Sequence, residues 1–250
     1  MSLSLAQWHE RFQQQAGWTR DLRANLFRQV GLKSAKHVLE VGCGTGAVLS
    51  RMNTEGKLYG IDVDLPRLDF ANTLSNHQFS LACGDGRQLP FDSGTFDISF
   101  CHYLLLWVTD PSAVLKEIVR VTHRNGAVIA FAEPDYGGRI DYPDDLAPLG
   151  DFQAEALKHQ GADTRMGRKL AALFSNSGLL NIQTGVLQGH WSQAPDQDSI
   201  NMEWNILKDD LKNKVNSAEL GSLQKKNMEA WRTGKRVLFI PTFYAFGIVA

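Results

Sequence analysis

Short apolar runs alternate with stretches of helical spacing through the first half of the chain. The runs carry few polar residues, so as strands they would be buried on both faces. Such strands, alternating with helices, are typical of a parallel sheet covered on both sides, and the pattern predicts a doubly wound α/β fold. The expected strands are 38–41, 58–61, 79–83, 96–101 and 127–133, and the expected helices lie near 47–52, 65–75 and 112–123.

The regular alternation ends after Glu133, where the residues up to Pro148 are rich in turn formers. We expect one domain over 1–250, in which 1–30 forms one or two amphipathic cover helices and 31–134 forms the core. Helical insertions are expected over 135–180 and 191–235. Within this second half the pattern predicts helices near 151–159, 165–177, 198–214 and 218–232, and strands near 181–190 and 237–249.

Local signals refine two of these boundaries. Asp110 and Pro111 form a sound helix start, because the aspartate can cap the helix and proline lacks an N–H that needs a partner there. Asn125 and Gly126 are expected to close that helix and turn into the next strand. Pro241 is expected at an edge or bulge of the last strand.

The segment from Val38 onward reads Val-Leu-Glu-Val-Gly-Cys-Gly-Thr-Gly, a strand followed by the three alternating glycines Gly42, Gly44 and Gly46. Glycine tolerates positive φ and has no Cβ, so this backbone can turn sharply and contact a ligand. A dinucleotide fingerprint has the spacing G-x-G-x-x-G, but here the third glycine comes one residue early and Ala47 takes the last place. With Glu40, the segment resembles the E-x-G-x-G-x-G turn of class I S-adenosylmethionine (SAM)-dependent methyltransferases, of the small-molecule, methyltransferase-11-like type.

The resemblance covers nearly the whole chain and implies a Rossmann-like, mostly parallel sheet of seven strands. In that family the seventh strand is antiparallel, and additions after the fifth and sixth strands cover the substrate. The implied cofactor is SAM, with its methionine part wrapped by the glycine turn, Cys43 included. Glu40 would order the turn or bind the SAM amino group.

Ligands of open α/β sheets bind at the carboxyl ends of the strands, so the residues there are candidates. Asp62 lies 18 residues after Gly44 and could accept hydrogen bonds from the ribose hydroxyls, since a carboxylate offers several acceptor sites. Asp64 competes for this role but is better suited to cap the following helix. Val63 would then flank the adenine.

By the same resemblance, Asp85 accepts from the adenine amino group and Gly86 offers its N–H to the ring, although Asp-Gly is also an ordinary turn. Cys101 and His102 are expected to border the methionine chain and the methyl group. In the N-terminal helices, Arg23 has the forked donors that suit the SAM carboxylate. Its alternative is a solvated side chain. Likewise, a tryptophan at position 18 (Trp18) could roof the pocket or pack on the sheet.

Methyl transfer from a sulfonium is an in-line displacement that a dry pocket favours. Two or three aromatic side chains are expected to line such a pocket, from the set Tyr103, Trp107, Tyr136, Trp204, Trp231 and Phe243. The candidate general bases are His102 and Glu133, with Asp135 beside the latter. A histidine that only orients a loop is an equal alternative, and many family members need no dedicated base. No metal site is expected.

The composition limits the kinds of partner and substrate that the chain is expected to bind. A net charge of −1 argues against bulk attraction to nucleic acid or an anionic membrane. The three cysteines suggest no disulfide framework, and neither a leader nor an apolar run of spanning length is present, so the cytoplasm is expected. Enzymes that methylate base amino groups resemble one another in a [DNS]-P-P-[YF] run after the fourth strand, where this chain has Cys-His-Tyr-Leu. A small-molecule methyl acceptor is therefore expected.

Three alternatives stay open. The acceptor could be RNA or protein, the chain could bind SAM without catalysis, or it could be an NAD(P)-dependent oxidoreductase on a related fold. The early third glycine and Asp85 argue against the oxidoreductase. The sequence leaves open the methyl acceptor, the atom that is methylated and the oligomeric state.

Overall fold

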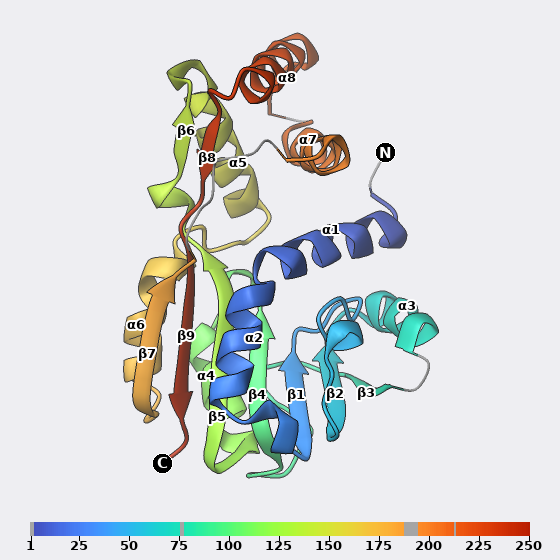
Figure 1. Ribbon diagram of the computed structural model, residues 1–250, viewed down its shortest axis with the longest axis vertical. Coiled ribbons are helices and arrows are strands. Elements are labelled where there is room, and N and C mark those ends of the chain that lie inside the picture. The colour runs from blue at the N-terminus through green and yellow to red at the C-terminus, as the bar shows by residue number, and fades with distance from the viewer. Residues whose placement is uncertain (1–2, 76–77, 188–194, 213) are drawn as a thin grey trace.

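The computed structural model describes residues 3–75, 78–187, 195–212 and 214–250. Its main sheet has seven strands in the order β3-β2-β1-β4-β5-β9-β7 (Figure 1). Strand β9 is antiparallel to both of its neighbours, and the strands from β3 to β5 are parallel. The bounds are β1 (His37–Val41), β2 (Lys57–Asp62), β3 (Phe79–Cys83), β4 (Phe96–His102), β5 (Thr122–Pro134), β7 (Leu180–Val186) and β9 (Thr242–Ile248). The predicted doubly wound sheet and its antiparallel strand are confirmed.

Successive residues of a strand face opposite sides of the sheet, and each side has its own apolar layer. Val38 packs with residues of α2 (Arg20–Gln29) and α3 (Leu65–Ser75), whereas Leu39 packs with residues of α4 (Pro111–Val121) and α6 (Met166–Ser175). Helix α6 therefore belongs to the layer that covers the sheet, although it lies within the range predicted to cover the substrate.

A second unit stands beyond the carboxyl ends of the parallel strands (Figure 1). It contains α5 (Ala147–His159), α7 (Gln197–Leu211) and α8 (Ser217–Arg232), with a small antiparallel sheet of β6 (Ile140–Tyr142) and β8 (Val237–Phe239). These helices share a separate apolar core that includes Leu149, Trp204 and Leu207. Helix α1 (Leu5–Trp18) crosses between this unit and the sheet. None of the helices in the described ranges has the length and apolar character needed to cross a bilayer.

The helix predicted over 47–52 is wrong, because only a short 3₁₀ segment, η2 (Leu49–Arg51), forms there. Residues 42–56 must make the glycine turn and then return to the start of the parallel strand β2. The N–H groups of Arg51 and Met52 donate to the carbonyls of Val48 and Leu49, three residues back, which is the 3₁₀ pattern.

Other boundaries also differ from expectation. Helix α4 ends at Val121, and the Asn125-Gly126 turn lies inside β5 instead of closing the helix; Asn125 has φ +65°. The last predicted strand is split at Pro241 into β8 and β9, which belong to different sheets. Pro241 lies in the gap between these strands, not at the edge or bulge position that was expected, and proline cannot donate to a ladder. Of the strand expected over 181–190, the part from 188 lies outside the described residues.

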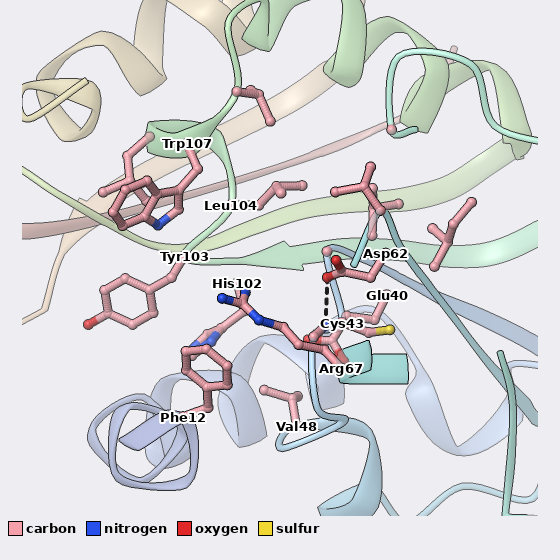
Figure 2. Close-up of a pocket in the computed structure, with 18 of the residues that line it drawn as sticks. Phe12, Glu40, Cys43, Val48, Asp62, Arg67, His102, Tyr103, Leu104 and Trp107 are labelled. Atoms are coloured by element: carbon pink, nitrogen blue, oxygen red, sulfur yellow. Dashed lines mark hydrogen bonds between the residues drawn. The ribbon is translucent and has the colours of Figure 1, made fainter. Parts of the chain in front are cut away.

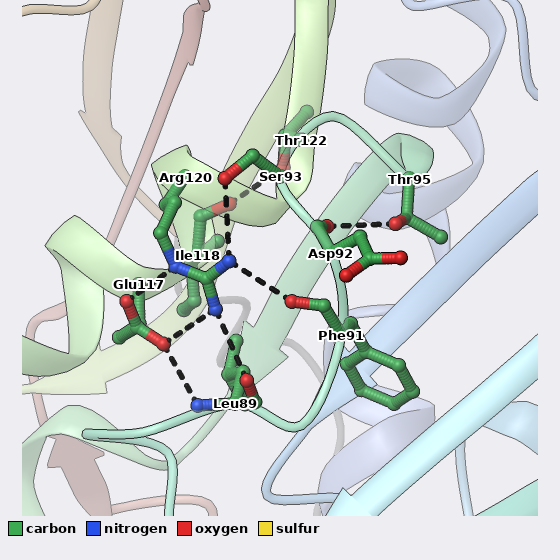
Figure 3. A network of polar contacts seen from close by, with 9 residues as sticks. All are labelled: Leu89, Phe91, Asp92, Ser93, Thr95, Glu117, Ile118, Arg120 and Thr122. Atoms are coloured by element: carbon green, nitrogen blue, oxygen red, sulfur yellow. Dashed lines mark hydrogen bonds and ion pairs between the residues drawn. The ribbon is translucent and has the colours of Figure 1, made fainter.

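A network of polar contacts holds the segment that follows β3 (Figure 3). The guanidinium of Arg120 pairs with Glu117 at 2.6 Å and donates to the carbonyls of Leu89 and Phe91 at 3.0 and 2.9 Å. Glu117 in turn accepts from the Leu89 N–H at 2.8 Å. These bonds fix a loop that leaves the sheet directly after Asp85 and Gly86.

Candidate active site

A cavity of about 310 Å³ lies at the carboxyl ends of β1, β2 and β4 (Figure 2). The strand order reverses between β1 and β4, where open α/β sheets bind their ligands. The cavity brings together nine of the predicted site residues. They are Glu40, Gly42, Cys43, Gly44, Asp62, Val63, Asp85, Gly86 and His102.

The glycine turn needs glycine at its first two positions. Gly42 has φ +77°, and a Cβ there would lie 2.7 Å from a methyl carbon of Leu104. Gly44 has φ +50°, and its Cβ would meet the ring of Phe12 at 3.6 Å. The N–H groups of Gly42 and Cys43 donate to the Ile61 carbonyl at 2.8 and 3.1 Å, which ties the turn to β2. Gly42 therefore lets the chain pass under Leu104, whereas Gly44 is required by its positive φ, since a Cβ at 3.6 Å would make an ordinary contact.

Asp62 is held by two backbone donors. Its Oδ2 accepts from the Gly44 N–H at 2.7 Å and its Oδ1 from the Asp64 N–H at 3.0 Å. A carboxylate has about four lone-pair sites, so two remain for a diol. Asp64 instead accepts from the Arg67 N–H at 3.0 Å at the start of α3, as predicted for a cap.

Glu40 is buried, and its Oε2 has no hydrogen-bond partner among the described residues. Burial raises the pKa of Glu40 to about 8, which the nearby Arg23 guanidinium opposes. A buried acceptor without a donor costs free energy, so an ammonium group at this place would supply both a donor and an opposite charge. The amino group of SAM has that chemistry. With the turn and Asp62, these residues fit the cofactor that the sequence implies.

Asp85 lines the cavity but is shared with a neighbour. Both of its oxygens accept from Arg87, at 2.6 to 3.1 Å, and these hydrogen bonds lower the pKa of Asp85. The pair is about half exposed. Asp85 therefore stays ionised at neutral pH, with Arg87 as its present partner.

His102 is tied to the N-terminal helices by a chain of hydrogen bonds. Its Nε2 lies 2.9 Å from the Thr19 hydroxyl, which accepts from Arg23 Nη1 at 2.5 Å. The Thr19 hydroxyl also donates to the Ala16 carbonyl at 3.3 Å, so that carbonyl and Nε2 compete for the hydroxyl proton. Burial, and then the charge of Arg23, lowers the pKa of His102 to about 3. The imidazole is therefore neutral at physiological pH, with one nitrogen engaged.

Five predicted site residues do not line this cavity. Gly46 packs against Phe79, where a Cβ would be 3.1 Å from the ring, and Cys101 is buried within the sheet core. Arg23 is buried behind the cavity and donates to Ala16 O at 2.8 Å and to Thr19. Trp18 lies under the Arg11 guanidinium, 4.9 Å from the ring centroid, and faces a different cavity.

The fifth, Glu133, is fully buried and serves the backbone. Its two oxygens accept from the N–H groups of three consecutive residues after β4, at 2.9 to 3.2 Å: Leu104, Leu105 and Leu106. Asp135 likewise caps Gly137 and pairs with Arg168. The structure therefore places neither carboxylate where it could take a proton from a substrate in the cavity.

Sequence reasoning missed the residues that cover the cavity from α1 and α3. Trp8, Phe12 and Gln15 line it from above, and the Arg67 guanidinium stacks 5.4 Å from the Phe12 ring centroid. The spacing of four and three residues puts the first three on one helix face. That periodicity was an available signal, but Trp18 also follows Gln15 by three residues, so spacing alone does not decide which of these side chains face the cavity.

A second cavity, of about 520 Å³, adjoins the first. Its walls come from α1, α5, α7 and α8, and residues lining both cavities mark the junction: Gln15, Tyr103, Pro134 and Tyr136. Tyr103 holds φ +53°, a left-handed conformation that is uncommon for a bulky residue. Of the other aromatic candidates, Trp204 and Trp231 line the second cavity, Trp107 lines the first and Phe243 lines neither.

Comparison with known proteins agrees with this geometry. A family model described as "Methyltransferase domain" matches residues 39–130. A demethylmenaquinone methyltransferase from Bacillus mycoides (strain KBAB4) is 30% identical over 193 residues, which cover 69% of this chain and 80% of that protein.

Two solved structures share the fold. The [4+2]-cyclase SpnF aligns with a TM-score of 0.57 at 16% identity, covering 91% of this chain and 80% of that one. A geranyl diphosphate C-methyltransferase from Streptomyces coelicolor A3(2), solved with S-adenosyl-L-homocysteine, aligns with a TM-score of 0.57 at 14% identity, covering 92% and 79%. Since a cyclase shares the fold, the fold alone does not decide the reaction.

Proposed function

The chain belongs to the class I SAM-dependent methyltransferases, and from that premise we propose that it methylates a small organic nucleophile held in the second cavity. The observation that carries this is the pair of adjoining cavities, which share Tyr103, Pro134 and Tyr136. One contains the residues that fit SAM, and the other is walled by the helices of the second unit. The similarity to an enzyme named for demethylmenaquinone supports a small acceptor.

Different residues of the first cavity would bind different parts of the cofactor. Glu40 would bind the amino group, Asp62 the ribose hydroxyls, and Val63 and Gly86 the adenine. The bound SAM supplies an activated methyl group on its sulfonium. Trp8 and Phe12 close the cavity from α1 and exclude water from it.

Positioning, with no dedicated base, is the proposed source of catalysis. With its pKa lowered to about 3, His102 is a weak base, and Glu133 is occupied by backbone donors. Burial raises the pKa of Tyr136 to about 12 and also raises that of Tyr103, so both phenols at the junction stay neutral. Their hydroxyls can orient an acceptor without adding charge. Alignment of this kind contributes about 7–11 kcal/mol in favourable cases.

A macromolecular acceptor is the less favoured alternative. The net charge of −1 does not attract nucleic acid, and the acceptor cavity is bounded by three helices of the second unit. We therefore propose that neither nucleic acid nor a membrane is a partner. A cytoplasmic location is proposed too, supported by the free thiols Cys43, Cys83 and Cys101.

The first test is calorimetric titration with SAM, with NAD and NADP as controls. Saturable binding of SAM alone supports the cofactor assignment. Transfer is then measured with methyl-labelled SAM against a panel of small phenols, amines and carbon acids, and against RNA and protein. Transfer to a small molecule supports the proposal, whereas SAM binding followed by transfer only to RNA or protein would refute the acceptor class.

A further inference from the structure

Three arginines line the second cavity and are absent from the lining of the first: Arg11, Arg139 and Arg236. Arg139 precedes β6 and Arg236 precedes β8, so the antiparallel pairing places them at opposite ends of the small sheet, with Asp141 of β6 between them. Asp141 pairs with both: its Oδ2 lies 2.6 Å from Arg139 Nε, and its Oδ1 accepts from Arg236 Nη2. The side chains of Arg139, Asp141 and Arg236 are only 5%, 3% and 1% exposed.

This cluster carries more positive than negative charge. Two guanidiniums share one carboxylate, and the other polar side chains bonded to them are the neutral Gln153 and Asn227. The remaining charged residues that line the cavity, Arg11 and Glu203, are paired with each other at 2.6 Å. Among the residues that the structure describes, the cavity wall therefore has one buried positive charge in excess.

The two guanidinium groups of Arg139 and Arg236 also have N–H donors that these hydrogen bonds do not use. Arg139 uses Nε and Nη2 on Asp141 and Nη1 on Gln153, which leaves two of its five N–H groups without a partner among the described residues. Arg236 gives Nε to Asn227, Nη1 to the carbonyls of Tyr142 and Val237, and one Nη2 hydrogen to Asp141. One N–H of Arg236 remains.

We propose that the methyl acceptor of this enzyme is an anion, with a carboxylate or phosphate group that accepts from the remaining N–H groups of Arg139 and Arg236. A buried, uncompensated charge is costly, and an anionic ligand with parallel acceptors would remove that cost and use the spare donors. The apolar part of the acceptor would lie against Trp204 and Trp231, which line the same cavity. This inference rests on the proposed function, because it names the class of molecule that the acceptor cavity selects.

The test uses the full chain saturated with S-adenosylhomocysteine and three probes of one shape: benzoate, phenyl phosphate and benzamide. Their dissociation constants are measured by calorimetry for the wild type and for Arg139→Gln, Arg139→Lys and Arg20→Gln. Arg20 is a matched control because its side chain is 80% exposed and outside both cavities. Arg139→Gln leaves Arg236 and Asp141 as a balanced pair, so the fold is expected to hold.

Benzoate or phenyl phosphate is expected to bind at least about tenfold more tightly than benzamide, and the stronger of the two identifies the anionic group. Arg139→Gln should weaken that anion at least about tenfold, Arg139→Lys should retain part of the affinity, and Arg20→Gln should match the wild type. Binding of benzamide equal to that of both anions, no binding by any probe, or an unchanged anion affinity in Arg139→Gln would each overturn the inference. Titration with S-adenosylhomocysteine distinguishes failure of this inference from failure of the proposed function. The affinity for S-adenosylhomocysteine should stay within about threefold of the wild type in every variant.

Discussion

Replacing Asp62 by asparagine tests the cofactor site most directly. The carboxylate accepts from Gly44 N–H with one oxygen and from Asp64 N–H with the other. An amide has a single acceptor oxygen, so its NH₂ group would face one of these donors. The lost backbone bond is expected to cost about 1 kcal/mol of stability, and the lost charge-assisted bonds to ribose about 1.5–3 kcal/mol of binding. SAM should therefore bind about ten- to a hundredfold more weakly.

Asp64→Asn provides the control. Asparagine caps helices about as well as aspartate, and the Asp64–Arg67 pair is about one-third exposed, so it contributes little. Calorimetric titration of both variants with SAM, at a temperature where circular dichroism shows both folded, gives the comparison. Equal dissociation constants for Asp62→Asn and the wild type would refute the ribose assignment, and a larger loss in Asp64→Asn would transfer it to that residue.

Three further predictions concern stability and pH. Gly42→Ala should lower the free energy of unfolding in urea by at least about 1–2 kcal/mol, because φ is +77° and the new Cβ meets a leucine methyl at 2.7 Å. Gly17→Ala, which meets nothing within 4 Å, is its control. Glu117→Gln should destabilise the protein at neutral pH and less so in acid: the hydrogen bond from its arginine partner lowers the pKa of Glu117, so its contribution is present above about pH 4.3 and is lost as the pH falls through that lowered pKa. The pH profile of the methyl-transfer rate should have the same shape near pH 6.5 in the wild type and in His102→Gln, because the pKa of His102 is far below that pH.

Contrary results would be equally informative. Equal stability of the two alanine variants would mean that the turn relaxes around a Cβ. A constant difference between Glu117→Gln and the wild type down to pH 3 would remove the carboxylate from the Figure 3 network. An inflection that His102→Gln abolishes would restore His102 as a general base.

The strands and their polar ends could be predicted because both signals are local. An unbroken apolar run marks a buried strand, and the residue that follows it must lie at the ligand edge, which placed Asp62, Asp85 and His102 at one cavity. The glycine spacing identified the cofactor for the same reason.

The direction in which a side chain points could not be predicted, because it depends on parts of the fold that are distant in the sequence. Glu133 follows a strand just as Asp62 does, yet it turns toward three unpaired N–H groups of the loop after β4. Their need for an acceptor depends on how that loop folds, which spacing does not reveal. Similarly, which face of α1 meets the cavity depends on the angle at which the helix crosses the sheet, so Trp18 was named from the sequence and Phe12 was missed.

Helix α1 is a wall shared by two ligands. Phe12 lies over the first cavity, Arg11 and Trp18 line the second, and Gln15 lines both. A ligand that fixes this helix in place does part of the ordering needed by the other ligand, and thermodynamic linkage makes that benefit equal in both directions. Cofactor and acceptor affinities are then joint quantities, each meaningful only at a stated concentration of the other. The ion pair between Arg11 and Glu203 extends the same coupling to α7.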